Sequence, residues 1–168
     1  MPDLKSNRRH ESLIPLSREH HYGLLVCLRI HRGIENHQAD VSWLSERAEK
    51  VIQFFESDLK THFKAEEEIV FPAMNGIEDS RAMIAQLVDE HRKLEKLVQR
   101  LKKARELRLA PLLREFADLL EAHIRTEERV LFPRYEKGVS SELAKQVGTR
   151  VLEVIGTAMK PKRPELLE

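Results

Sequence analysis

Apolar residues recur at steps of three and four along most of the chain, and no segment alternates between apolar and polar residues with a period of two. This spacing is typical of amphipathic α-helices, whose apolar side chains line one face. Capping residues, glycines and prolines divide the pattern into five segments. The segments predict helices from about Pro15 to Ile34, from Asp40 or Ser42 to Pro72, from Asp79 or Ser80 through Leu101, from Pro111 to about Pro133, and from Ser140 or Ser141 to about residue 159.

Short connections between the four long segments favour antiparallel neighbours. We therefore predict an all-α fold, an up-down-up-down antiparallel four-helix bundle with an additional C-terminal helix that covers one side or one end. The bundle is expected over about residues 12–136 and the extra helix over about 140–159. Because 168 residues suit one domain, the whole chain, 1–168, is expected to form a single domain.

The second and fourth segments repeat one pattern with identical spacing. It reads Phe55-x6-His62-x3-Glu66-Glu67-x3-Phe71-Pro72 in the first copy and, 61 residues later, Phe116-x6-His123-x3-Glu127-Glu128-x3-Phe132-Pro133 in the second. Because every named position keeps its offset, the match indicates an internal duplication of a helix pair.

Histidine and glutamate occupy positions of this repeat where leucine or valine would be expected in a core. His62 and Glu66 continue the apolar stripe of the second segment, and His123 and Glu127 continue that of the fourth. At a spacing of four residues, the two side chains of each pair lie on one helix face, a single turn apart. We therefore expect both pairs to point into the bundle.

The first and third segments each add one inward histidine. His91 lies between Leu87 and Leu94 on the apolar stripe of the third segment. On the first segment, His20 follows an acidic residue, Glu19, just as His91 follows Glu90, which favours His20. The spacing of apolar residues after His91, however, matches the spacing after His21. The first-segment histidine is therefore either His20, which we favour, or His21.

Six such groups at one level of a core would be unstable without compensation. A buried, unpaired carboxylate costs several kcal/mol, and a buried imidazole also needs a partner. A metal ion compensates both, because neutral imidazole nitrogen and carboxylate oxygen are metal ligands. Six protein ligands are too many for one tetrahedral zinc ion, and they fit two metal ions bridged by the carboxylates.

The order His, His-xxx-Glu, His, His-xxx-Glu over four helices resembles the hemerythrin-like (HHE cation-binding) family, four-helix bundles that hold a non-haem di-iron centre. The resemblance covers about residues 12–136. It implies two non-haem iron ions (Fe²⁺/Fe³⁺) with an oxo or hydroxo bridge, and a small diatomic or peroxide ligand (O₂, NO or peroxide). It also implies terminal iron ligands at His20 (or His21), His62, His91 and His123, and bridging carboxylates at Glu66 and Glu127.

Two positions differ from the oxygen-carrying hemerythrins, which have His-xxx-His on the third helix and an Asp five residues after the last histidine. Here Glu95 lies four residues after His91, and Glu127 and Glu128 lie four and five residues after His123. The set of five histidines is therefore missing from the sequence. This favours sensing, redox chemistry or iron handling over reversible oxygen carriage.

Composition and the positions of the remaining charged residues lead to expectations about partners and location. Lys+Arg 29 against Asp+Glu 28 gives a net charge of +1, which argues against a nucleic-acid or anionic-membrane surface. A single cysteine, Cys27, together with a polar N-terminus, favours a cytoplasmic location and a packing role for the thiol. Glu67, Glu68 and Glu128 lie off the apolar stripe, so we expect them to be solvated, with Glu128 a weak backup ligand.

Three functions fit these features. The first is a di-iron protein that binds or reacts with O₂, NO or peroxide in sensing or stress defence. The second is an iron-responsive regulatory module whose fold reports metal supply to a partner protein. The third is a metal-free scaffold, which requires the histidines alone to satisfy the carboxylates.

Overall fold

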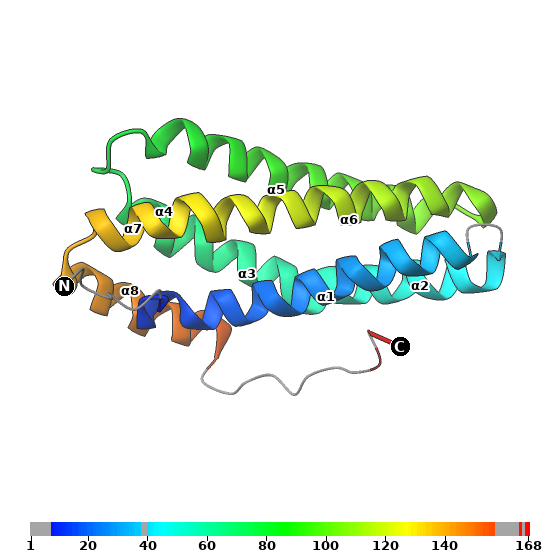
Figure 1. Ribbon diagram of the computed structural model, residues 1–168, viewed down its shortest axis with the longest axis horizontal. Helices are drawn as coiled ribbons and strands as arrows, with labels where there is room; N and C mark the ends of the chain where they lie inside the picture. Colours follow the sequence, from blue (N-terminus) through cyan, green and yellow to red (C-terminus); the bar gives the residue numbers. More distant parts are fainter. Residues whose placement is uncertain (1–7, 38–39, 157–164, 166) are drawn as a thin grey trace, which may run out of the picture.

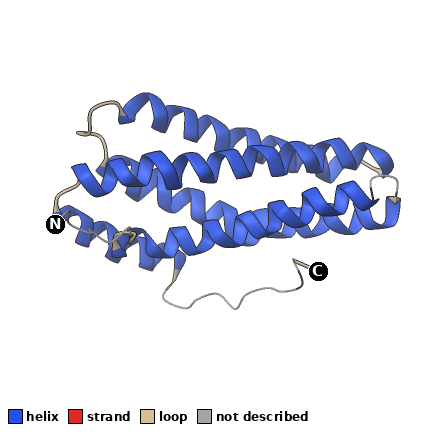
Figure 2. Ribbon diagram, viewed as in Figure 1, coloured by secondary structure: helices blue, strands red, loops and turns tan. Residues whose placement is uncertain are grey.

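The computed structural model describes residues 8–37, 40–156, 165 and 167–168. Within that part of the chain all regular structure is helical, and consecutive long helices run antiparallel side by side, with α8 at one end (Figures 1 and 2). This confirms the predicted all-α bundle. The helices are α1 (Ile14–His37), α2 (Val41–Phe54), α3 (Lys60–Ala65), α4 (Phe71–Ala73), α5 (Ser80–Lys103), α6 (Leu109–Thr126), α7 (Phe132–Gly138) and α8 (Ser141–Ile155).

Short π-helical turns join some of these helices end to end. Phe55–Leu59 and Glu66–Val70 link α2, α3 and α4, and Glu127–Leu131 links α6 to α7. Helices α2, α3 and α4 therefore form one continuous helix that contains two wider turns, and α6 and α7 form another that contains one. A π turn closes hydrogen bonds over five residues instead of four, and such turns often lie at functional sites.

The prediction that the fourth helix ends near Pro133 is wrong, because the helix continues through α7 to Gly138. Pro133 is the second residue after the π turn and lies in the first turn of α7. Proline lacks the amide hydrogen that an α-helix interior requires, but the change of hydrogen-bond register after a π turn leaves one donor position unused. The proline therefore fits there without ending the helix.

Two of the predicted helix caps are present. The side chain of Asp40 accepts a hydrogen bond from the backbone nitrogen of Trp43 at 3.1 Å, and Ser140 Oγ accepts one from the backbone nitrogen of Leu143 at 3.2 Å. Each satisfies a backbone donor that the first helical turn leaves free. These caps begin α2 and α8 where the sequence predicted.

The C-terminal helix α8 ends at Ile155, earlier than the predicted residue 159. Gly156 stops it with φ 93°, a backbone conformation that glycine adopts without strain. Residues 157–159 of the predicted helix lie outside the described residues. Helix α8 packs against α3 and against the turn Glu11–Leu13 before α1, so it covers one end of the bundle as expected.

Buried apolar side chains form two separate clusters along the bundle. One lies around α2 and the adjoining parts of α1, α5 and α6, and the other lies around α4, α7 and α8. Along α5, Leu94 belongs to the first cluster and Leu87 to the second, with His91 between them. The core is therefore interrupted by a polar layer near its middle.

Gly33 provides a test of how closely α1 approaches α2. A Cβ atom at Gly33 would lie 1.9 Å from Cζ2 of Trp43, whereas a Cβ at Gly76 would meet nothing within 4 Å. We expect Gly33→Ala to lower the free energy of unfolding by about 1–3 kcal/mol through overpacking, and Gly76→Ala to change it by less than about 0.5 kcal/mol. Urea unfolding followed by circular dichroism measures both, and equal stability of the two variants would contradict this packing.

Candidate metal centre

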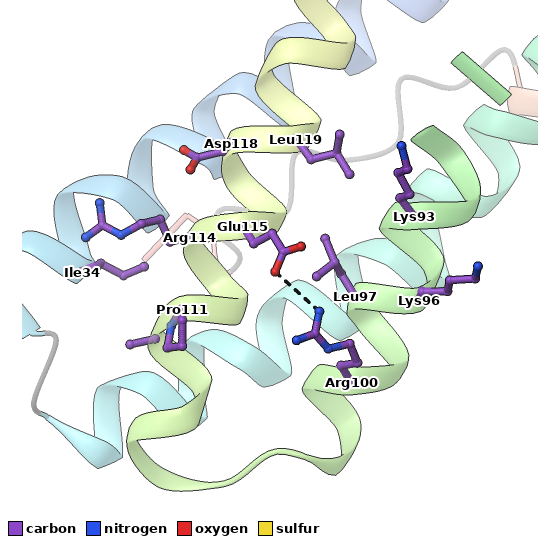
Figure 3. Close-up of a pocket in the computed structure, with 11 residues that line it drawn as sticks. Ile34, Lys93, Lys96, Leu97, Arg100, Pro111, Arg114, Glu115, Asp118 and Leu119 are labelled. Carbon is purple, nitrogen blue, oxygen red and sulfur yellow. Dashed lines mark ion pairs between the residues drawn. The ribbon is translucent and has the colours of Figure 1, made fainter. Parts of the chain in front are cut away.

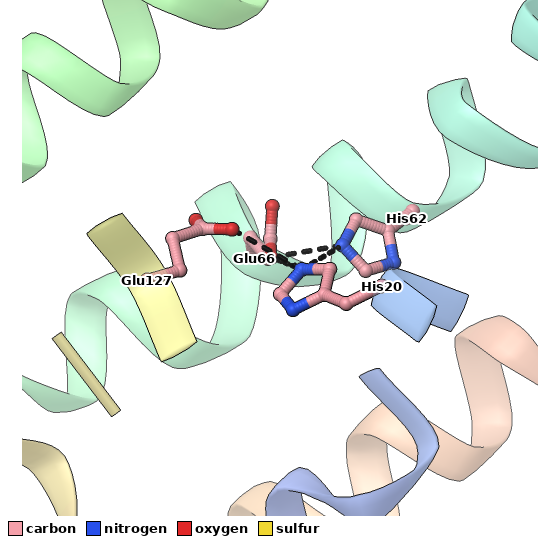
Figure 4. A group of neighbouring side chains, drawn as sticks. All are labelled: His20, His62, Glu66 and Glu127. Atoms are coloured by element: carbon pink, nitrogen blue, oxygen red, sulfur yellow. Dashed lines mark hydrogen bonds and ion pairs between the residues drawn. The ribbon is translucent and has the colours of Figure 1, made fainter. Parts of the chain in front are cut away.

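The polar layer contains all six of the predicted site residues. They form two groups, within each of which one potential ligand atom per residue lies within 4.8 Å of the others. Glu66 and Glu127 belong to both groups, each at the first position of a π turn. The first group, drawn in Figure 4, contains His20, His62, Glu66 and Glu127, and the second contains Glu66, His91, His123 and Glu127.

The structure also separates the two candidates on the first helix. His20 points into the layer and is 3% exposed, while His21 is exposed and lies outside both groups. The acidic residue that precedes both His20 and His91 was therefore the better guide to the first-helix position. The apolar offsets that favoured His21 were misleading.

Glu66 lies between the two pairs of histidines. Its Oε1 is 3.0 Å from Nε2 of His62 and 3.4 Å from Nε2 of His20. Its Oε2 is 3.3 Å from Nε2 of His91, on the other side. One carboxylate therefore faces ligand atoms of both groups, as a bridging ligand would.

Glu127 lies across from Glu66 in the same manner. Its Oε2 is 3.1 Å from Nε2 of His20 and 3.3 Å from Nε2 of His123. Both carboxylates are fully buried, and none of their four oxygens has a hydrogen-bond partner within the described part of the chain. Because burying an unsatisfied carboxylate is costly, this arrangement requires positive charge between the side chains. The donor set of imidazole nitrogens and carboxylate oxygens fits two first-row metal ions.

The imidazole rings face each other in pairs. Nε2 of His20 lies 2.9 Å from Nε2 of His62, and Nε2 of His91 lies 3.1 Å from Nε2 of His123. Two imidazole nitrogens that approach so closely can share a proton or can both direct lone pairs at one cation. Each pair, together with the two carboxylates, forms a group that could hold a metal ion.

In each of the four inward histidines, the second ring nitrogen, Nδ1, is hydrogen-bonded to a further carboxylate. Since a carboxylate only accepts, the Nδ1–H of each ring is the donor, which leaves Nε2 free as a ligand. This outer carboxylate fixes both the tautomer and the orientation of its ring. The Nδ1···O distances are 2.7 Å for His20–Glu128, 2.7 Å for His62–Glu19, 2.7 Å for His91–Glu67 and 2.8 Å for His123–Glu90.

The prediction that Glu67 and Glu128 are solvated is therefore wrong. Their side chains are only 23% and 25% exposed, and each bonds a histidine on another helix. Glu68 is exposed, as expected. The missed signal is adjacency, because each of the four outer carboxylates precedes or follows a residue of the two groups in the sequence.

Aromatic rings cover the two halves of the centre unequally. Phe132 stacks on His20 with ring centroids 5.4 Å apart, and its counterpart in the repeat, Phe71, stacks on His91 at 6.0 Å. His91 has a second stacking partner, Phe63, at 3.8 Å. The residue that corresponds to Phe63 in the second copy is Ile124, which has no ring to stack.

A cavity of about 600 Å³ opens on the less covered side. Its lining includes His20, His62 and His123, and apolar side chains that make up most of its wall. Gly23 and Ile124 line it and are smaller than Leu94 and Phe63, which lie at the corresponding positions by spacing from the inward histidine and by the repeat. Phe63 also borders the cavity. A small molecule can therefore reach the first group along an apolar path.

A larger and more open groove of about 960 Å³ lies elsewhere on the bundle surface, between α5 and α6 (Figure 3). None of the six site residues lines it, and its rim carries charged side chains such as the Arg100–Glu115 ion pair at 3.5 Å. This groove is therefore separate from the polar layer.

Comparison with known proteins agrees with this geometry. Residues 12–144 match the family model of the Hemerythrin HHE cation binding domain. The chain belongs to this family. No curated protein and no solved structure gives a significant match. No helix among the described residues of this hemerythrin-family chain is long and apolar enough to cross a membrane.

Without a metal ion, protons compensate the carboxylates of the hemerythrin-type site. Burial lowers the pKa of His62, but the charges of Glu66 and Glu19 outweigh it and raise the pKa to about 9. The pKa values of His20 and His123 are likewise raised, because their carboxylate neighbours outweigh desolvation. Burial raises the pKa of Glu66, but the surrounding histidines reverse this and hold it well below its ordinary value. A bound cation would take the place of these protons.

The pKa shifts predict how the metal-free protein responds to pH. A histidine whose pKa is raised on folding stabilises the fold below its unfolded pKa, and this contribution is lost as pH rises through the folded value. The free energy of unfolding should therefore fall between pH 6.5 and about 9. Urea titrations of the chelator-treated protein measure it, and the exposed His21→Ala variant should show the same slope. A free energy that rises over this range would contradict the assigned proton positions.

Proposed function

We propose that this hemerythrin-family protein holds two non-haem iron ions and binds or reacts with O₂, NO or peroxide in sensing or stress defence. The observation that carries the proposal is the pair of buried carboxylates, Glu66 and Glu127, whose four oxygens lack hydrogen bonds and face two pairs of imidazole nitrogens. Iron is the metal that family membership favours among those the donor set accepts.

In this proposal each histidine pair is terminal to one ion. His20 and His62 would hold one ion, His91 and His123 would hold the other, and Glu66 and Glu127 would be ligands to both. Iron supplies a redox-active centre that accepts small ligands without an organic cofactor.

The protein residues hold, orient and shield the site. The four outer carboxylates keep each Nδ1 protonated and each Nε2 directed inward, which sets ligand geometry before a metal arrives. The two apolar clusters exclude water from above and below the layer. The cavity beside His20 and His62 gives small, uncharged ligands a route to the first ion.

Metal content tests the site assignment. Wild-type protein, purified without an affinity tag and reconstituted with Fe²⁺, should contain about two irons per chain and show visible absorption that changes on reduction. Glu66→Ala removes a ligand from both ions and should lose both, while His62→Ala should retain at most one. Because His21 is exposed and outside both groups, His21→Ala should retain two.

Far-ultraviolet circular dichroism establishes that each variant is folded, so that metal loss is not a consequence of unfolding. Full iron content in Glu66→Ala would refute the assignment of the bridging ligands. Wild-type protein that binds zinc but no iron would refute the di-iron proposal itself.

The cavity makes a second prediction. Ile124 lines the cavity beside His20, and its repeat counterpart, Phe63, stacks on His91. Replacing Ile124 with Phe therefore places the same residue type at both positions of the repeat. The variant should keep two irons but bind NO at least about tenfold more slowly, because the path to the first ion is filled. Leu28→Phe, at an exposed position of α1 that does not line the cavity, is the matched control. Stopped-flow absorbance measures the rates, and unchanged NO binding in Ile124→Phe would exclude this route.

A further inference from the structure

The outer carboxylates of two histidines are held by arginines. Arg92 Nη2 lies 2.5 Å from Oε2 of Glu67, whose Oε1 bonds Nδ1 of His91. Arg9 Nη2 lies 2.8 Å from Oε2 of Glu128, whose Oε1 accepts from Nδ1 of His20. One histidine of each group is thereby linked through a carboxylate to a guanidinium.

The two arginines come from unrelated places in the sequence. Arg92 directly follows His91 on α5, so its counterpart, counted from the inward histidine of the first helix, is at position 21. That position is His21, which is exposed. The guanidinium is supplied instead by Arg9, from the segment before α1, which lies outside the span 12–144 that matches the family.

Arg9 is held from several directions. Its Nη2 also donates to the main-chain oxygen of Glu128 at 2.9 Å, and its Nη1 donates to Oε1 of Glu136 at 2.9 Å. The backbone nitrogen of His10 donates to the same Glu136 oxygen at 2.9 Å, which fastens the segment itself. The guanidinium carbon lies 5.3 Å above the ring of Phe132, which in turn stacks on His20.

Burial distinguishes the two arginines further. The side chain of Arg9 is 21% exposed, against 52% for Arg92. An exposed ion pair contributes little, whereas a charge-assisted, multidentate contact at a partly buried site contributes more. Arg9 therefore fixes Glu128 more firmly than Arg92 fixes Glu67.

We propose that Arg9 is a positioning residue of the metal centre, through which the segment before α1 completes the half-site of His20 by fixing Glu128. Arg9 has no recorded contact with either ring nitrogen of His20, and it acts on the orientation of the ring through Glu128 and through Phe132. The inference rests on the proposed two-metal site, and it implies that metal binding and docking of residues 8–13 stabilise each other.

Metal titration of the full chain tests this, with Co²⁺ as an air-stable probe of the imidazole and carboxylate ligands. Competition against a chromophoric chelator yields two dissociation constants for the metal-free wild type. Arg9→Met should weaken one site about tenfold and leave the other unchanged. Arg92→Met, the matched control, should weaken either site by no more than about threefold. Arg9→Lys should recover part of the loss, since an ammonium group replaces the charge but not the forked contact.

A purely structural role for Arg9 would lower the melting temperature while both dissociation constants stay as in the wild type, and this result would overturn the proposal. Equal weakening of the two sites would overturn it as well. If wild-type protein binds no Co²⁺, Zn²⁺ or Fe²⁺, the two-metal function fails instead, which separates the two ideas.

Trypsin cleavage provides a measurement on the wild type alone. The bond after Arg9 should be cut at least about fivefold more slowly when Co²⁺ is bound, because the ion holds His20, Glu128 and therefore Arg9 in place. Cleavage after Lys103, the last residue of α5 and not part of the Arg9 contacts, is the internal reference. Equal rates after Arg9 with and without Co²⁺, in protein shown to bind it, would contradict the coupling.

Discussion

The arrangement of the core depends on two buried carboxylates that have no hydrogen-bond partner among the described residues. Glu66 and Glu127 are fully enclosed, and imidazole nitrogens lie 3.0–3.4 Å from Oε1 and Oε2 of Glu66 and from Oε2 of Glu127. An uncompensated charge in a core costs several kcal/mol, so positive charge must enter the layer as protons or as metal ions. The division of the core into two apolar clusters and the outer carboxylates on the four rings both follow from accommodating this layer.

The backbone is adapted to the same layer. Glu66 and Glu127 each begin a π turn, and both turns are followed by Phe-Pro, so the duplication preserved the wide turn together with the buried carboxylate. The extra residue in a π turn shifts the later side chains around the helix axis. This brings Phe71 and Phe132 onto the rings of His91 and His20.

The sequence predicts those parts that depend on helix periodicity. The apolar stripe gave the bundle, and the polar residues within that stripe were the six that the structure brings together. Helix periodicity fails to predict the contacts of Glu67 and Glu128. The apolar stripe gives only the direction of each Cα–Cβ bond, and a long side chain outside the stripe can still reach a neighbouring helix. Helix periodicity also fails for Arg9, since no local pattern signals its contact with Glu128 over 119 residues of sequence.

The two halves of the site have the same kinds of potential ligand but differ in what restrains their histidine rings. Where aromatic packing on a ring is weaker, the polar contacts to that ring are stronger. His91 lies between Phe63 and Phe71, which restrain its ring by packing on both sides. His20 stacks only on Phe132 and otherwise borders the cavity, so the opening that admits a ligand also removes a restraint on the ring. A ring with less packing needs stronger polar anchoring to keep one orientation. The more buried of the two arginine–carboxylate pairs, Arg9 with Glu128, lies on this less packed ring, where that anchoring is required.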